Sequence, residues 1–104
     1  MRTYKQIPAV IRQVVRNVAN AQRGSYRHDV IMGGQSWSGA DLKGKARQYG
    51  ARYAESRAAA LADVGAALSA RGWGARTDIV RVPDSKRSTR ELVITSPSGL
   101  DYIW

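Results

Sequence analysis

The stretch 38–71 carries the longest helical pattern in the chain, so the other elements have to be arranged around it. Ser38 and Asp41 have the spacing of a variant capping box, and Gly72 suits the position just past a helix end. We predict one long helix here, which is either the spine of the domain or broken at a glycine, Gly50 or Gly65. Its apolar side is formed by residues that recur about every 3.6 positions: Leu42, Ala46, Tyr49, Tyr53, Ala60, Val64, Ala67 and Leu68.

A second helix is predicted over residues 6–23. Pro8 suits its first turn, and Gly24 suits its stop. The apolar residues that recur at helical spacing are Ile7, Val10, Ile11, Val14, Val18 and Ala21.

The opposite face of this helix contains guanidinium and amide groups without a carboxylate: Arg12, Gln13, Arg16, Asn17, Asn20 and Arg23. Surface helices usually mix charges of both signs, because such pairs stabilise them. Guanidinium and amide groups suit phosphates and purine edges, so this face is the main candidate for nucleic-acid contact. Two alternatives stay open: a solvated face that happens to lack acids, and an amphipathic targeting peptide.

The charge of the whole chain also favours a polyanionic partner. The chain has 17 Lys and Arg against 8 Asp and Glu, a net charge of +9. Residues 1–27 hold six of these cations and no acid. Nucleic acid, an acidic protein surface and an anionic membrane all fit. No apolar run approaches the ~20 residues of a membrane span, so we expect no membrane insertion.

Short apolar runs separated by turn residues predict strands in the remaining chain. We predict a strand at 30–32 and three further strands at 76–82, 90–95 and 100–104. The last three are expected to form an antiparallel meander, with 30–32 as a fourth strand. The predicted fold is therefore a single α+β domain over 1–104, with elements in the order α-β-α-β-β-β.

Further cations lie outside the first helix. Lys43, Lys45 and Arg52 belong to the long helix, and Lys86 and Arg87 to a polar loop between two strands. They complete the predicted nucleic-acid or partner-binding set.

Residues 39–46 miss the phosphate-binding loop pattern G-x-x-x-x-G-K-[ST] at one place, because Ala46 replaces the hydroxyl that would hold Mg²⁺. The chain is also too short for the parallel sheet that supports such a loop, which argues against an NTPase.

We expect no metal and no cofactor. The chain has no cysteine and a single histidine, His28, which excludes the usual Cys and His zinc sites. The pair His28–Asp29 has no nucleophile nearby in sequence, so we interpret it as a surface or strand-end pair.

The segment Trp37-Ser38-Gly39-Ala40-Asp41-Leu42-Lys43-Gly44-Lys45-Ala46 resembles segments of small proteins encoded by bacteriophages and prophages. The resemblance covers about residues 26–57. It implies the cytoplasm of a bacterial host cell. It also implies one of two roles, nucleic-acid housekeeping or inhibition of a host machine such as a CRISPR effector.

Three functions are compatible with these features. The first is non-catalytic binding of DNA or RNA. The second is an inhibitor that binds an acidic protein surface, with Trp37 and Trp73 as exposed contact residues. The third is a metal-independent ribonuclease that uses His28, Arg81, Arg90 and Tyr102. A homodimer would suit an alanine-rich helix and an unpaired strand edge.

Overall fold

The computed structural model describes residues 2–32, 43–81 and 88–104, and for Tyr26 and residues 43–54, 81 and 88–90 it describes the backbone alone. The described elements form an α+β fold, as predicted. In chain order they are η1 (Tyr4–Gln6), α1 (Ala9–Asn20), α2 (Tyr26–Met32), α3 (Lys43–Ser69), β1 (Gly74–Arg81), β2 (Ser88–Thr95) and β3 (Asp101–Ile103).

The three strands form the predicted antiparallel meander, in the order β1-β2-β3. Thr77 pairs with Leu92 across the first ladder, and Ile94 pairs with Tyr102 across the second. The turn from β2 to β3 is closed by a hydrogen bond from Gly99 N–H to Ser96 O at 2.9 Å. Gly99 has φ +85°, a conformation that glycine adopts without steric cost.

The N-terminus extends the sheet beyond β3. Arg2 and Tyr102 form a parallel bridge. Arg2 N–H donates to Asp101 O at 3.2 Å, and Ile103 N–H donates to Arg2 O at 2.8 Å. The outer edge of β3 is therefore covered by the start of the chain.

The strand predicted at 30–32 is wrong, because these residues end helix α2. Three apolar residues are too few to separate the two periodicities. The neighbours Val30 and Ile31 are both buried, whereas a strand on one face of a core buries alternate residues. Trp104 adds a long-range contact, since its Nε1 donates to Ile31 O at 2.9 Å near the end of α2.

Helix α3 is a single element from Lys43 to Ser69, and Gly65 does not break it. It ends as predicted at Gly72, which has φ +77°. Trp73 N–H donates to Leu68 O and Gly72 N–H to Ser69 O, both at 3.0 Å, which is the Schellman pattern. The capping residues predicted at its start, Ser38 and Asp41, lie outside the described residues.

The core lies between the helices and one face of the sheet. It contains Ile11, Val15 and Ala19 of α1, Ala60, Val64 and Leu68 of α3, and Leu92, Ile94 and Tyr102 of the strands. The buried residues of α1 follow a four-residue spacing. The predicted apolar face is therefore wrong at three positions. Val10 is 52% exposed and Ala21 is exposed, although both were predicted to be apolar contacts, and Val15, which was not predicted, is fully buried.

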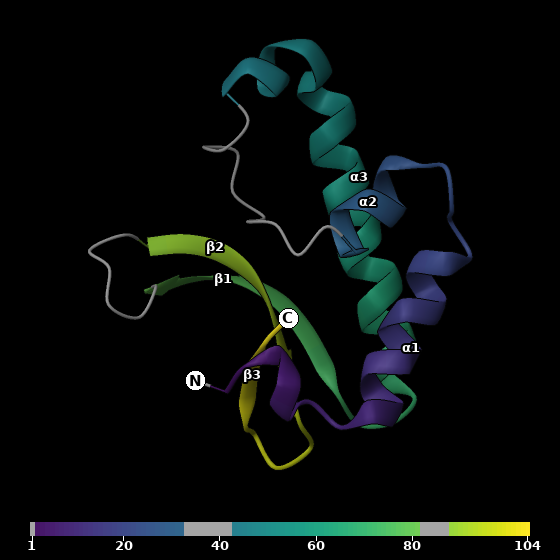
Figure 1. Ribbon diagram of the computed structural model, residues 1–104, viewed down its shortest axis with the longest axis vertical. Coiled ribbons are helices and arrows are strands. Elements are labelled where there is room, and N and C mark those ends of the chain that lie inside the picture. The colour runs from purple at the N-terminus through teal and green to yellow at the C-terminus, as the bar shows by residue number, and fades with distance from the viewer. Residues whose placement is uncertain (1, 33–42, 82–87) are drawn as a thin grey trace.

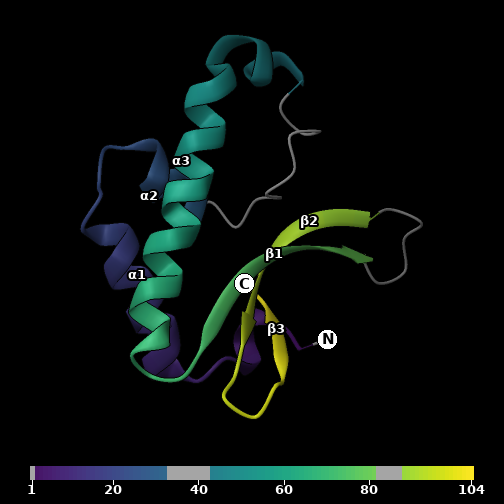
Figure 2. The ribbon, with the colours of Figure 1, turned by 180° about the vertical axis from the view of Figure 1, so that it is seen from behind.

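Figures 1 and 2 show the arrangement from opposite sides. Helices α1 and α2 lie on one side of α3. The sheet lies beside the lower part of α3, and the β1–β2 hairpin extends away from the helices. Ile79 shares the core-facing side of β1 but is 60% exposed, and it lies near the end of that strand, two residues before Arg81.

Candidate nucleic-acid interface

A short turn before α1 places a tyrosine beside the polar face of that helix. Thr3 N–H donates to Oε1 of Gln6 at 2.9 Å, and Gln6 N–H donates to Thr3 O at 3.0 Å. The bond to the Gln6 side chain belongs to a capping box at the start of the 3-10 turn η1, and the bond from Gln6 N–H closes that turn. Pro8 then begins α1, so Tyr4 lies against the first turns of the helix.

Tyr4 is the contact point for both predicted arginines of α1. The guanidinium carbon of Arg12 lies 5.4 Å from the centre of the Tyr4 ring, and that of Arg16 lies 5.7 Å from it. Nη2 of Arg16 also donates a hydrogen bond to the Tyr4 hydroxyl. Residues four apart share one helix face, so a single ring can hold both guanidinium groups.

Tyr4 is itself held by the C-terminal residue. Its ring meets Trp104 edge to face, with ring centres 4.7 Å apart and planes at 77°. Trp104 is fixed in turn by the hydrogen bond to Ile31 O. The two guanidinium groups therefore rest on a chain of contacts that reaches α2 and the last strand.

This support leaves the guanidinium groups ordered without neutralising them. Arg12 and Arg16 are half-buried. Among the described carboxylates, none lies within 4.0 Å of a side-chain nitrogen of Arg12, Arg16 or Lys5. The Nε atom of Arg12 is buried and has no described hydrogen-bond partner. Ordered, unpaired guanidinium groups can offer two parallel N–H bonds to a phosphate at little further entropic cost.

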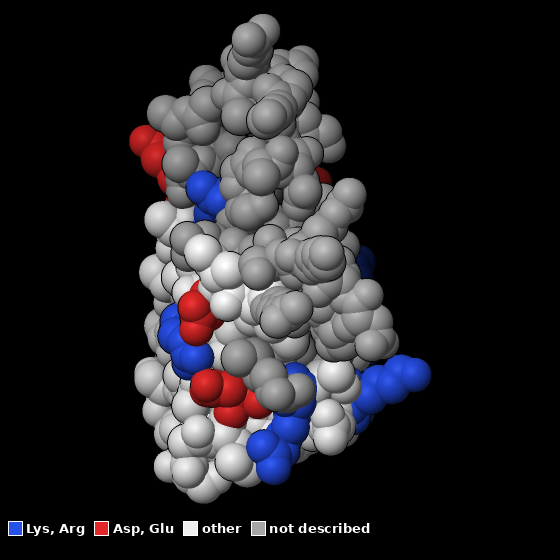
Figure 3. Space-filling view, turned by 90° about the vertical axis from the view of Figure 1, so that its left-hand side faces the viewer, with Lys and Arg blue, Asp and Glu red and all other residues white. Residues whose placement is uncertain are grey.

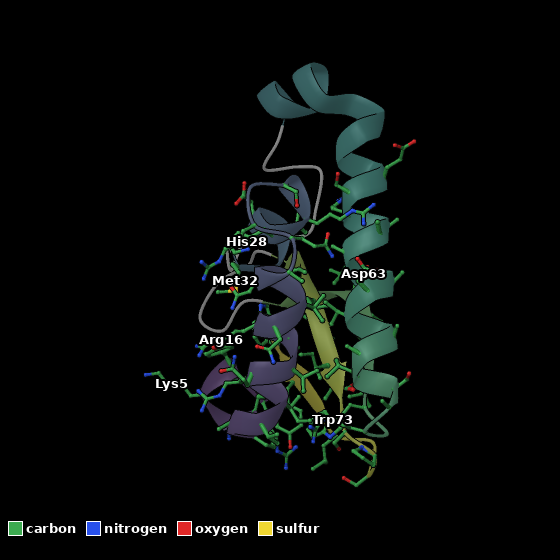
Figure 4. All side chains as sticks on the ribbon, turned by 90° about the vertical axis from the view of Figure 1, so that its right-hand side faces the viewer. Lys5, Arg16, His28, Met32, Asp63 and Trp73 are labelled. Atoms are coloured by element: carbon green, nitrogen blue, oxygen red, sulfur yellow. The ribbon has the colours of Figure 1, made fainter. Side chains whose placement is uncertain are left out.

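Two amide side chains adjoin these arginines on the same helix. Gln13 and Asn17 are both exposed, and Nε2 of Gln13 donates to Oδ1 of Asn17 at 2.8 Å. We call Lys5, Arg12, Gln13, Arg16 and Asn17 the basic face. Figure 4 shows Lys5 and Arg16 on one side of the molecule and Asp63 of α3 on the other.

Two cations elsewhere in the described chain, Arg27 and Arg76, are paired with acids. Arg27 lies 3.6 Å from Asp63, which also accepts a hydrogen bond from Gln22 at 2.7 Å. On the face of the sheet opposite the core, Arg76 bonds to Asp101 at 3.0 Å and approaches Asp78 at 3.4 Å. Figure 3 shows blue and red side chains side by side on one surface of the molecule.

The pKa of Asp101 reflects this network. Arg76 donates to its carboxylate and lowers its pKa to about 2, and the hydrogen bond from the Thr95 hydroxyl at 2.7 Å acts in the same direction. The same contacts raise the pKa of Arg76. Arg76 is thus paired with carboxylates of the same surface. The arginines of the basic face have no such described partner.

The other predicted binding residues are not brought to the basic face by the described structure. Arg23 is exposed in the turn after α1. Lys43, Lys45 and Arg52 lie in the first half of α3, where the backbone alone is described. The predicted loop residues Lys86 and Arg87, and the first half of the segment 39–46, lie outside the described residues.

His28 has a structural role. Its Nδ1 is 2.8 Å from Ala19 O. A carbonyl oxygen only accepts, so this nitrogen carries the proton and donates to one of the last carbonyls of α1. Tyr102, a second member of the predicted ribonuclease set, is 8% exposed and packs on Trp73 with ring centres 5.5 Å apart.

Trp73 packs against the core and is half-buried, so it is not the exposed contact residue that we predicted. Trp37, the other predicted contact residue, lies outside the described residues.

The residues that sequence reasoning missed are Tyr4 and Lys5. The sequence does contain a signal for their placement, the Thr3-x-x-Gln6 capping box ahead of Pro8. The contact between Tyr4 and Trp104 has no local signal, because it joins the two ends of the chain.

Searches against protein families, curated proteins and solved structures find no match to this chain. The described residues include no group of three or more His, Cys, Asp or Glu that would hold a metal ion. In the same part of the chain, every helix is too short or too polar to cross a membrane.

Proposed function

We propose that this protein binds nucleic acid through the basic face, without catalysis. The observation that carries the proposal is the pair Arg12 and Arg16, which rest on Tyr4 and face no described carboxylate. Phosphate contacts supply much of the affinity of proteins for nucleic acid, and arginine is well suited to them.

The amide groups of the basic face support the same proposal. Gln13 and Asn17 lie one residue after each arginine, so phosphate-binding and amide groups alternate along one side of α1. Such amides can bind phosphate and sugar oxygens or read base edges. Following the resemblance of residues 26–57, we place this activity in a bacterial host cell, in a phage-related role.

The test is a titration of the purified protein against labelled duplex DNA, single-stranded DNA and RNA at two salt concentrations. We expect at least one of these to bind, and the double variant Arg12→Ala/Arg16→Ala to weaken binding about tenfold or more. The matched control is Arg27→Ala/Arg71→Ala, which removes the same charge from exposed positions off the basic face and should change binding much less. Absence of binding at low salt, or equal losses in both double variants, would refute the proposal.

An inhibitor that binds an acidic protein surface is the second candidate. Two exposed apolar side chains favour it, Val10 of α1 at 52% exposure and Met32 of α2 at 41%. Met32 lies on the same side of the molecule as Lys5 and Arg16 (Figure 4). Interfaces between proteins combine apolar side chains with arginine. If no nucleic acid binds, a pull-down from bacterial lysate that is lost in Arg12→Ala/Arg16→Ala would favour this alternative.

A further inference from the structure

One exposed side of helix α1 is formed by residues without charge. Val10 is 52% exposed, and Gln13, Asn17 and Asn20 are exposed as well. Their spacings of three, four and three residues place them on one helix face. We call these four residues the amide ridge. Figures 1 and 2 show α1 at the outer edge of the molecule, where a large ligand can reach this face.

The side chains of the amide ridge are partly fixed and still have free hydrogen-bonding atoms. Nε2 of Gln13 donates to Oδ1 of Asn17 at 2.8 Å, which orients the two amides relative to each other. Oε1 of Gln13 and Nδ2 of Asn17 have no described partner, and neither has the amide of Asn20. The linked pair therefore presents one acceptor and one donor towards solvent.

This combination matches the major-groove edge of an A·T base pair. Adenine offers the N6 amino group as a donor and N7 as an acceptor, and Asn and Gln are the side chains that commonly bind both. The thymine of the same pair offers a methyl group, which apolar side chains contact. Val10 supplies an exposed apolar group at one end of the amide ridge.

Arg12 and Arg16 border the amide ridge along one side. Each precedes an amide residue by one position, and both guanidinium groups rest on Tyr4. Charged groups at the border and uncharged groups on the exposed face suit a duplex, because phosphate contacts position a protein and base contacts specify the sequence. The ridge from Val10 to Asn20 is about 15 Å long, which corresponds to about four base pairs at about 3.4 Å each.

We propose that α1 lies in the major groove of duplex DNA and that the amide ridge reads A·T base pairs. The inference rests on the proposed function and names its ligand class. Double-stranded RNA does not fit, because its major groove is too deep and narrow for side chains to read. Arg12 and Arg16 supply affinity for any sequence, and Gln13 and Asn17 supply the discrimination between sequences.

Selection of binding sites from a randomised duplex DNA library tests the proposal, followed by affinity measurements on the selected site. We expect the enriched sites to share A·T pairs within a stretch of about four base pairs. Replacement of a contacted adenine by 7-deazaadenine removes N7 alone and should weaken binding about tenfold. The duplex RNA of the same sequence should bind no better than an unrelated duplex.

Gln13→Ala/Asn17→Ala separates readout from phosphate binding. This variant should bind the selected site and an unrelated duplex about equally and should be insensitive to 7-deazaadenine. Its affinity for the unrelated duplex should stay near that of the wild type, because both arginines remain. Alanine is the best helix former, and circular dichroism establishes that the variant is folded.

The matched control is Ser69→Ala/Ser98→Ala, which removes two exposed, uncharged polar groups away from α1 and should keep the sequence preference of the wild type. The proposal is overturned if the library yields no enriched sequence, or if folded Gln13→Ala/Asn17→Ala keeps the preference. Either result leaves the proposed function standing when Arg12→Ala/Arg16→Ala still weakens binding. Absence of any binding at low salt refutes both.

Discussion

At the residue scale, one tyrosine determines how the basic face is built. Tyr4 contacts Arg12 and Arg16 through its ring and Arg16 again through its hydroxyl, and its own position depends on Trp104. Free arginine side chains lose considerable rotamer entropy when they bind a phosphate. Support by Tyr4 lowers that loss, so Tyr4 should affect ligand affinity although it carries no charge.

Replacement of Tyr4 tests whether its contacts with the arginines matter, because it leaves the net charge of the protein unchanged. We expect Tyr4→Ala to weaken nucleic-acid binding about tenfold, because cation–π contacts of roughly 0.5–1 kcal/mol each to Arg12 and Arg16 are lost. Tyr4→Phe keeps the ring and loses only the hydroxyl, so it should lie within a few-fold of the wild type. Fluorescence anisotropy measures both affinities at unchanged net charge. Equal binding by folded Tyr4→Ala and the wild type would contradict the supporting role.

A second prediction at this scale concerns Asp101. Its pKa in the folded protein is lowered to about 2 from 3.8, first by the hydrogen bond from Arg76 and then by that from Thr95. The folded state therefore binds this proton less readily than the unfolded state. The resulting stability is fully present above pH 3.8 and is lost as the pH falls towards about 2.

Because Arg76 and Asp101 are partly exposed, solvent screening reduces the contribution to about 1 kcal/mol. Asp101→Asn removes the titrating group, so its free energy of unfolding should fall less steeply between about pH 5 and pH 2 than that of the wild type. Urea denaturation at several pH values measures the difference. Parallel pH profiles of the two proteins would exclude this role of Asp101.

At the element scale, two glycines near the end of α3 are expected to behave in opposite ways. A Cβ added to Gly65 in the helix interior meets no atom within 4 Å, so Gly65→Ala should stabilise the protein by about 0.5–1 kcal/mol. Gly72 has φ +77°, and a Cβ there would lie 3.3 Å from Cγ of Pro97, so Gly72→Ala should destabilise it by about 1 kcal/mol or more.

Thermal and urea unfolding of both variants measure this contrast. A destabilised Gly65→Ala would mean that α3 is not a regular helix at this position. A neutral Gly72→Ala would mean that the Schellman turn does not fix the end of the helix.

The elements with strong local signals were predicted correctly, and those fixed by distant contacts were not. The start of α1 is marked by Pro8, the end of α3 by Gly72, and the meander by its turn residues. The predicted end of the first helix at residue 23, before Gly24, is wrong, because α1 ends at Asn20 and a turn follows. Helix α2 is only seven residues long, and its apolar triplet fits either periodicity. The burial of Ile31 and the hydrogen bond from Trp104 determine its form, and neither can be read from neighbouring residues.

In the candidate site too, local signals predicted part of the arrangement and distant contacts determine the rest. Periodicity was sufficient to place Arg12, Gln13, Arg16 and Asn17 together on one face of a helix. Periodicity could not place Tyr4 beneath the arginines, because that contact depends on the path of the chain through η1 and on Trp104 at the other end of the chain.

At the scale of the whole molecule, the described charges are unevenly distributed. The basic face lacks described acidic neighbours, whereas the face of the sheet with Arg76 and Asp101 is internally paired. Such an asymmetry orients a polyanion during approach and makes binding depend on ionic strength. If Lys5, Arg12 and Arg16 each contact a phosphate, affinity for duplex DNA should fall about 40-fold between about 50 mM and about 200 mM salt.

The salt dependence of nucleic-acid affinity tests the central claim most directly. Each phosphate contact contributes a slope of about −0.9 for duplex DNA, or about −0.7 for a single strand, to the logarithm of affinity against the logarithm of salt concentration. Arg12→Ala/Arg16→Ala should therefore reduce the slope by nearly two units, while Arg27→Ala/Arg71→Ala leaves it close to that of the wild type. Equal slopes in the wild type and Arg12→Ala/Arg16→Ala would contradict binding through the basic face.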